Sequence, residues 1–166
     1  MQLDEGKLRL DPRLWRVDAW RFEELCIRLE APSPAAPDPA FSPAELFARG
    51  LGLYRGHFLA SDAEHSWAIS YRERLPSRFL RLVTQAGHHH EQAGEWGQAK
   101  RYYQLGLEVD ELAEGLYQCL MLCCRELGQL AETVTAYRRC RSVLAAVGLK
   151  PTAKTVELYH RLTATL

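Results

Sequence analysis

The sequence has no excess of charge of either sign, because Lys plus Arg and Asp plus Glu both number 21. Binding of DNA or anionic lipid through the overall field of the protein is therefore excluded, and such binding would need a local patch. No stretch approaches the about 18 apolar residues of a membrane span. The charged start MQLDEGKLRLDPR also lacks the apolar run of about 7 to 15 residues found in a signal peptide. We expect a cytoplasmic protein that does not contact membranes.

Cysteines are few and odd in number. The five thiols, Cys26, Cys119, Cys123, Cys124 and Cys140, lie within helical patterns, as is typical of a reducing compartment. Cys119 and Cys123 share a helix face and suggest half of a metal site or a redox pair, but no His or Cys group at zinc-finger spacing supplies further ligands. Packing as small buried hydrophobes is the simpler interpretation of the cysteines.

Clusters of residues that could bind a metal or catalyse a reaction are scarce as well. His88, His89 and His90 are consecutive, and on a helix they point about 100° apart, so they cannot converge on one ion. No part of the sequence assembles a nucleophile, a base and an oxyanion hole. We expect no metal, no cofactor and no catalytic activity.

Helical periodicity and helix end signals cover most of the chain. The expected helices are 18–30, 43–54, 62–93, 95–108, 112–127, 129–147 and 152 to the end. The second of these begins with a capping box, in which Ser42 is the N-cap, Pro43 the first helical residue and Glu45 the returning acid. Pro76 predicts a kink or break near Leu75 in the third.

Two segments are not expected to be helical. Residues 3–10 form a candidate for a short β-hairpin or extended segment, with DEG as the turn. Residues 32–39 contain four prolines and predict a stiff, extended loop. A length of 166 residues with 47% hydrophobic residues favours one domain with a substantial core. We place that domain at 18–166, preceded by a linker or remnant at 1–17.

An internal repeat is the most informative feature that the sequence does have. The stretches EQAGEWGQAKRYYQLGLEVD and RELGQLAETVTAYRRCRSVL place Gly94 and Gly128 34 residues apart, which is the period of the tetratricopeptide repeat. The two units are 80–113 and 114–147, and the remaining helices complete the stack as atypical caps. The sequence thus predicts an all-α fold, a tetratricopeptide-like right-handed superhelix of antiparallel helix pairs.

Small residues occupy the positions where the two helices of each unit should approach closely. These are Gly87 in the first helix of the first unit, and Gly106 and Cys140 in the second helices. A larger side chain there would separate the helices, at a cost of about 1 to 3 kcal/mol.

Outward positions on the first helix of each unit should line the groove of such a stack. These candidate partner-binding residues are Arg81, Thr84, Gln85 and His88 in one unit and Gln118, Leu122 and Arg125 in the next. They would contact an extended or helical peptide, although each is alternatively a merely solvated position. The Lys and Asn set that clamps a carboxylate in some tetratricopeptide grooves is absent, so a C-terminal carboxylate is not the favoured ligand.

Several motifs in order give the chain a family resemblance. They are the LYRGHFL start, Trp67 followed by RERL, the GLEVD junction and the KPT start of the last helix. Over residues 18–163 the chain resembles the bacterial transcriptional activator domain, the tetratricopeptide-like module of antibiotic regulatory proteins and related bacterial regulators. Pro76 departs from the usually uninterrupted helix of that family.

The resemblance also implies what stands before this domain. In the family a winged-helix DNA-binding domain normally precedes it, and LDEGKLRLDPRLWRVDAWRFE resembles the end of the wing running into the first activator helix. Since only residues 1–17 precede Asp18 in this sequence, we expect the recognition helix to be missing from it. We expect no direct nucleic-acid binding by this chain alone.

The function implied by the resemblance is that of a protein-interaction and regulatory module of a bacterial transcriptional regulator. Its partner would be the transcription machinery or a neighbouring regulatory domain, and self-association into a homodimer is a further expectation. The alternative is a sensor for a small anionic ligand or nucleotide, bound between Arg81, His88 and Arg125.

Overall fold

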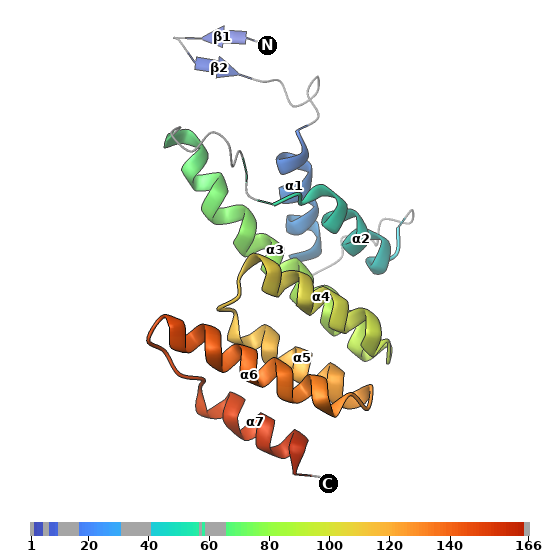
Figure 1. The fold of residues 1–166 in the computed structure, drawn as a ribbon. Coiled ribbons are helices and arrows are strands. Elements are labelled where there is room, and N and C mark those ends of the chain that lie inside the picture. Colours follow the sequence, from blue (N-terminus) through green and yellow to red (C-terminus); the bar gives the residue numbers. More distant parts are fainter. Residues whose placement is uncertain are drawn as a thin grey trace. The chain divides into compact units, whose positions relative to one another are not determined.

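In the part of the chain that the structure describes, the regular elements are helices apart from one short strand pair (Figure 1). The computed structural model describes residues 2–4, 7–9, 17–30, 41–56, 58 and 66–164. Within them lie β1 (Gln2–Asp4), β2 (Lys7–Arg9), α1 (Asp18–Glu30), α2 (Pro43–Leu53), α3 (Ser66–Gln92), α4 (Trp96–Val109), α5 (Glu114–Glu126), α6 (Leu130–Ala146) and α7 (Ala153–Thr163). The all-α prediction is confirmed. None of the helices in the described part of the chain has the length and apolar character needed to cross a membrane.

The strands β1 and β2 pair antiparallel, with Gln2 opposite Arg9 and Leu3 opposite Leu8. The turn between them, residues 5–6, lies outside the described residues. The same holds for the proline-rich loop predicted at 32–39.

The chain divides into two compact units, one up to Arg78 and one from Phe79. In the first unit α1 packs against α2 and the adjoining residues, where the rings of Phe22 and Tyr54 lie 5.5 Å apart. A bidentate ion pair joins α1 to the start of α3, since Arg74 Nε and Nη2 lie 2.6 and 3.3 Å from the two carboxylate oxygens of Glu23.

The start of α2 has the predicted capping box. The Ser42 hydroxyl accepts a hydrogen bond from the Glu45 backbone N–H at 3.3 Å, and the Ser42 backbone N–H donates to Glu45 Oε2 at 2.7 Å. Pro43 occupies the first turn, where its missing N–H leaves no bond unmade. The sequence therefore fixes this helix boundary locally.

The helix α3 is continuous through Pro76, so of the predicted kink or break near Leu75, the break is wrong. Proline removes the N–H that would bond to the carbonyl of Arg72, and a proline inside a helix costs about 3 kcal/mol. Leu75 and Phe79 beside it are each only 4% exposed. Burying two such side chains contributes about 1.5 to 3 kcal/mol each, which offsets that cost.

Three helices of the second unit end in the same turn. Gly94, Gly128 and Gly148 all have positive φ, at 73°, 71° and 77°. In each turn the residue after the glycine donates its N–H to a carbonyl five residues earlier, which is the Schellman motif. The pairs are Glu95 and His90, Gln129 and Cys124, and Leu149 and Leu144, at 2.8, 2.8 and 2.9 Å. The glycine stops predicted from the sequence are confirmed.

Close helix approach explains the small residues of the second unit. A Cβ on Gly87 would lie 2.3 Å from the Tyr103 ring, and one on Gly106 would lie 2.5 Å from the Leu116 side chain. Cys140, in the slot that matches Gly106, is fully buried. A larger side chain at Gly87 would therefore clash with the buried Tyr103 ring, and one at Gly106 with the ends of the Leu116 and Val83 side chains.

Polar and aromatic contacts join different helices of the second unit. The Lys100 ammonium on α4 donates to Gln129 Oε1 at the start of α6, at 2.7 Å, and also pairs with Glu132. The Tyr137 ring on α6 stacks on Tyr159 of α7, with centroids 4.0 Å apart and planes 9° apart. The helices α4 to α7 thus pack as a continuous series within the second unit.

A carboxylate at the start of α5 anchors the last helix. Glu114 Oε1 accepts hydrogen bonds from the Thr152 N–H at 2.7 Å, the Thr152 hydroxyl at 2.9 Å and the Thr155 hydroxyl. Burial alone would raise the pKa of this carboxyl, but the hydrogen bonds outweigh burial and lower the pKa below its usual value. Glu114 therefore caps α7 as an anion.

Replacing Glu114 with Gln should weaken the docking of α7 by about 1 to 2 kcal/mol near neutral pH, because a charge-assisted cap is lost. Because the pKa of Glu114 is lower in the folded state than in the unfolded state, ionised Glu114 stabilises the fold fully at pH values above its unfolded-state pKa. This stabilisation is lost as the pH falls through the folded-state pKa. The difference between wild type and variant, measured by urea unfolding, should therefore shrink below the ordinary glutamate pKa. A pH-independent difference would contradict this assignment.

Candidate functional site

One depression of the second unit collects most of the residues predicted to line a groove. Its volume is about 580 Å³. The lining is Leu80, Arg81, Thr84, Gln85 and His88 from α3, Ala113, Gly115, Leu116, Gln118 and Cys119 around α5, and Lys154 from α7. We call this the groove depression. Five of the seven predicted residues are among these, whereas Leu122 and Arg125 are not.

The groove depression has an apolar floor and a basic surround. Leu116 is buried and Leu80 is half-buried, while Arg81, His88 and Lys154 are exposed. None of the lining residues is acidic. The depression is therefore suited to a group that combines apolar surface with negative charge.

Two polar residues of the lining are held by bonds within the protein. The Thr84 hydroxyl donates to the Leu80 carbonyl at 2.7 Å, and Gln118 Nε2 donates to the Thr155 hydroxyl at 2.7 Å. Their orientation is thus set before any ligand arrives. No hydrogen bond of the Gln85 amide is found among the described residues, so this amide can contact a ligand.

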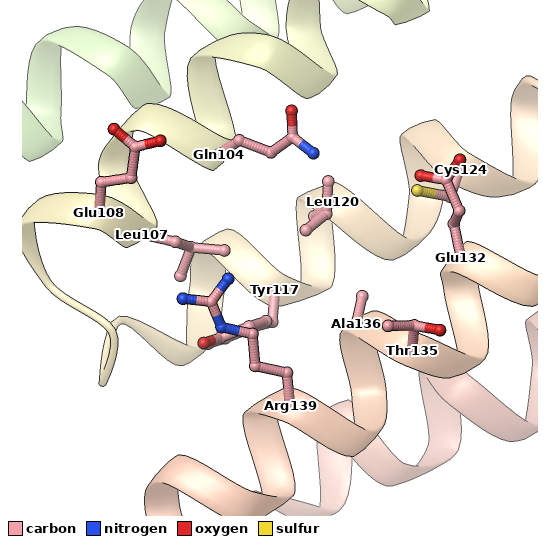
Figure 2. A pocket seen from close by; sticks show the side chains of 10 residues that line it. All are labelled: Gln104, Leu107, Glu108, Tyr117, Leu120, Cys124, Glu132, Thr135, Ala136 and Arg139. Carbon is pink, nitrogen blue, oxygen red and sulfur yellow. The ribbon is translucent and has the colours of Figure 1, made fainter.

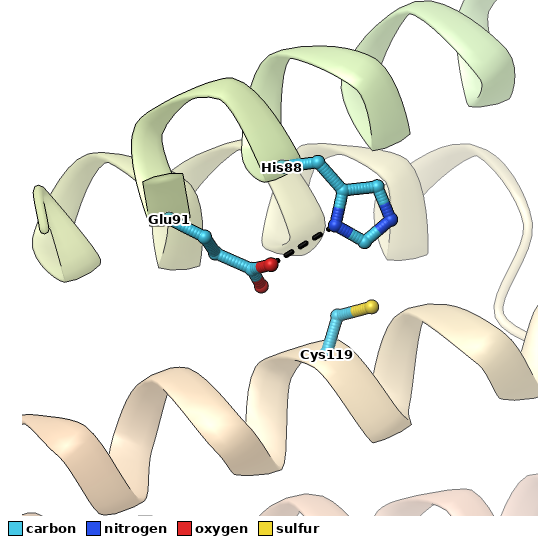
Figure 3. Close-up of side chains that lie close together, drawn as sticks. All are labelled: His88, Glu91 and Cys119. Atoms are coloured by element: carbon cyan, nitrogen blue, oxygen red, sulfur yellow. Dashed lines mark hydrogen bonds and ion pairs between the residues drawn. The ribbon is translucent and has the colours of Figure 1, made fainter. Parts of the chain in front are cut away.

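A polar cluster adjoins the groove depression, where α3 faces α5 (Figure 3). His88 Nδ1 lies 2.9 Å from Glu91 Oε2, and the Tyr103 hydroxyl donates to Glu91 Oε1 at 2.8 Å. The ligand atoms of His88, Glu91 and Cys119 all lie within 4.8 Å of one another. Cys123 directs its thiol toward the same carboxylate, at 3.7 Å. Among the described residues, this is where nitrogen, oxygen and sulfur donors converge.

The thiols of this cluster are protonated at neutral pH. Burial, followed by the nearby Glu91 carboxylate, raises the pKa of both Cys119 and Cys123 above that of an ordinary thiol. Burial likewise raises the pKa of the Tyr103 phenol. Since the thiolate is the reactive form of cysteine, neither thiol is poised as a nucleophile.

The consecutive histidines point to different neighbours. The ring of His90 stacks on Tyr102, with centroids 5.3 Å apart, and His90 Nδ1 contacts Glu95 at 2.5 Å. His88 instead faces Glu91. The histidine run therefore does not act as a unit.

A second depression of about 380 Å³ lies along α4, α5 and α6 (Figure 2). Its lining is Gln104, Leu107, Glu108, Tyr117, Leu120, Cys124, Glu132, Thr135, Ala136 and Arg139. Glu108 and Glu132 give this surface acidic groups that the groove depression lacks. The Tyr117 hydroxyl at its base is buried without a hydrogen-bond partner among the described residues. The second depression is the natural site for control substitutions.

Part of the groove lining was missed by the sequence interpretation, although the repeat period contains a signal for it. Cys119 and Gly115 stand one 34-residue repeat after Gln85 and Arg81. Both line the groove depression together with those residues. Lys154 carries no such signal, because α7 lies outside the two matched units.

Comparison with known proteins identifies one family. The sequence model described as the bacterial transcriptional activator domain matches residues 17–163. This match spans both compact units and includes the whole groove depression. No curated protein and no solved structure matches the chain.

Proposed function

Since the chain belongs to the bacterial transcriptional activator domain family, we propose that it is the protein-interaction module through which a bacterial transcriptional regulator is controlled. The observation that carries this proposal is the groove depression, which gathers five residues predicted for partner binding. Such a module acts by binding another protein at this surface. The partner is the transcription machinery or a neighbouring regulatory domain.

We further infer a tetratricopeptide-like right-handed superhelix for the helix pairs. The 34-residue recurrence supports this inference, as do the matching Schellman turns at Gly94 and Gly128. The contact of Lys100 with Glu132 also supports it, because this contact links the second helices, α4 and α6, of the two adjacent 34-residue repeats. In such stacks the first helices line the inner surface that receives a peptide.

The occupant that fits the groove depression best is an acidic, partly apolar segment of a protein. Carboxylates of that segment would pair with Arg81 and Lys154, and an apolar side chain would cover Leu116. Exposed Val147 and Leu149, at 53% and 56% exposure, add an apolar surface at the end of α6. That surface supports self-association into a homodimer as a second part of this proposal.

A photo-crosslinking amino acid placed at Gln85 should capture a protein partner in cells of the native host. The same group at Gln104, in the second depression, is the matched control. Charge reversal by Arg81→Glu with Lys154→Glu should lower capture at least about tenfold, because like charges at an interface are strongly unfavourable. Arg138→Glu should leave capture unchanged. Equal capture from Gln85 and Gln104 would contradict the proposal.

The second candidate function, a sensor of small anionic ligands or nucleotides, is favoured by the same basic surround. Lys154, rather than the predicted Arg125, joins Arg81 and His88 there. A thermal-shift screen against nucleotides and metabolites separates the two functions. A ligand present at 100 times its Kd stabilises the protein by about 2.7 kcal/mol. A pure docking surface gains nothing from any of these compounds.

A further inference from the structure

Two neighbouring helices bring together three metal donors that neither helix holds alone. His88 and Glu91 lie one turn apart on α3, and Cys119 reaches the same point from α5 (Figure 3). We propose that His88, Glu91 and Cys119 bind one divalent transition-metal ion of the zinc class. This inference is independent of the proposed docking function, since it needs only the contact between α3 and α5.

The donor types select the class of ion. Imidazole nitrogen, carboxylate oxygen and thiolate sulfur are the three donors used by protein zinc sites, whereas calcium and magnesium prefer oxygen alone. Binding of the ion displaces the Cys119 thiol proton to solvent, and the resulting thiolate and the Glu91 carboxylate carry two negative charges, which a divalent ion neutralises. A site with one thiolate therefore excludes hard cations by its chemistry.

The distances fit with small side-chain movements. Donors on a tetrahedral zinc ion lie about 3.3 to 3.8 Å from one another, given bonds of about 2.0 to 2.3 Å. In the structure the His88 and Glu91 atoms are 2.9 Å apart, and all three ligand atoms are within 4.8 Å. Coordination of an ion would lengthen the contact between His88 and Glu91 and shorten those to the Cys119 sulfur.

Neighbouring groups already hold the carboxylate in place. The Tyr103 hydroxyl donates to Glu91 Oε1 at 2.8 Å, which leaves Oε2 directed to the side of His88. Such outer partners orient metal ligands and raise affinity by about 10 to 100-fold. The Cys123 thiol, 3.7 Å from Glu91, supplies a second neighbour of this kind.

The fourth coordination position is open to the groove depression. His88 and Cys119 belong both to the cluster and to the lining of that depression. Three protein ligands with one open position is the arrangement of zinc sites that accept an outside ligand. Water fills this position in solution, and a side chain of a docked protein can replace it.

The test uses the full chain without a purification tag, kept reduced and titrated with Zn²⁺ by calorimetry and with Co²⁺ by absorption spectroscopy. We expect one ion per chain and a thiolate-to-cobalt charge-transfer band. Cys119→Ala should abolish that band, and His88→Ala and Glu91→Gln should each weaken binding at least about tenfold. His88 is half exposed, so its replacement leaves the fold intact, which circular dichroism checks.

His89→Ala is the matched control for His88→Ala, because the two histidines are adjacent but only His88 belongs to the cluster. Its affinity for Zn²⁺ should equal that of the wild type. Failure of the wild type to bind Zn²⁺ would overturn the proposal and reveal a hydrogen-bonded polar network only. Binding that survives both Cys119→Ala and His88→Ala would also overturn it. Partner capture at Gln85 is a separate readout, so the failure of one proposal is distinguishable from that of the other.

Discussion

Replacing Gly87 with alanine should destabilise the second unit by about 1 to 3 kcal/mol, although alanine is the better helix former. The added Cβ would lie 2.3 Å from two ring carbons of Tyr103. That ring cannot turn away, because Tyr103 is fully buried and its hydroxyl is bonded to Glu91. Movement of α3 away from α4 is then the remaining response, and it opens the core. Urea unfolding followed by circular dichroism measures the loss.

Gly97→Ala is the matched control for this experiment. Gly97 also lies in a helix, but a Cβ there meets no atom within 4 Å. This variant should be as stable as the wild type or slightly more stable, since only helix propensity changes. If Gly87→Ala and Gly97→Ala behave alike, the close approach of α3 and α4 is wrong. A second replacement, Tyr103→Leu, should restore part of the stability lost in Gly87→Ala.

The largest single effect is expected for Tyr103→Ala, at about 3 to 5 kcal/mol. Tyr103 is among the largest fully buried side chains and packs against Gly87 of α3. Its removal leaves a cavity and also takes the hydrogen-bond donor from a partly buried carboxylate. Both effects add to the free energy lost on truncation. Chemical denaturation of the variant provides the measurement.

Tyr103→Phe separates the two contributions. It keeps the ring and removes only the hydroxyl that donates to Glu91, so the expected loss is about 1 to 3 kcal/mol. Tyr137→Ala, at the equivalent position one repeat later, should cost less than Tyr103→Ala because Tyr137 is only partly buried. An equal loss for Tyr137→Ala and Tyr103→Ala would mean that burial at this repeat position does not set stability.

The helix boundaries were predictable because their signals are local. The capping box of Ser42 and Glu45 marks the start of α2. Gly94 and Gly128 mark turns with positive φ, which glycine adopts without a steric cost. The helix α1 covers the residues predicted for it. Each of these features depends on a few neighbouring residues.

The continuity of α3 could not be predicted in the same way. The sequence around Pro76 contains the local cost of a proline but not the compensating burial of Leu75 and Phe79. That burial depends on other elements of the fold. A local rule was therefore overruled by tertiary packing.

In the candidate site, too, some residues were predictable from the sequence pattern and others depended on tertiary packing. The repeat period places Arg81, Gln85 and Gln118 on one surface without any knowledge of distances. Lys154 reaches that surface from the last helix, which the repeat pattern does not cover. The convergence of Cys119 with His88 depends on the register between α3 and α5, and no spacing within one helix encodes it.

The burial of the native thiols has a practical consequence for labelling. Burial raises the pKa of Cys124 and, to about 11, that of Cys140, and it acts in the same direction on Cys119 and Cys123. Alkylating reagents attack the thiolate, so these side chains react slowly at neutral pH. A single cysteine introduced on the solvent side of α6 or α7 would outcompete them for a maleimide dye. Fluorescent reporters can thus be attached without removing Cys119, Cys123, Cys124 or Cys140.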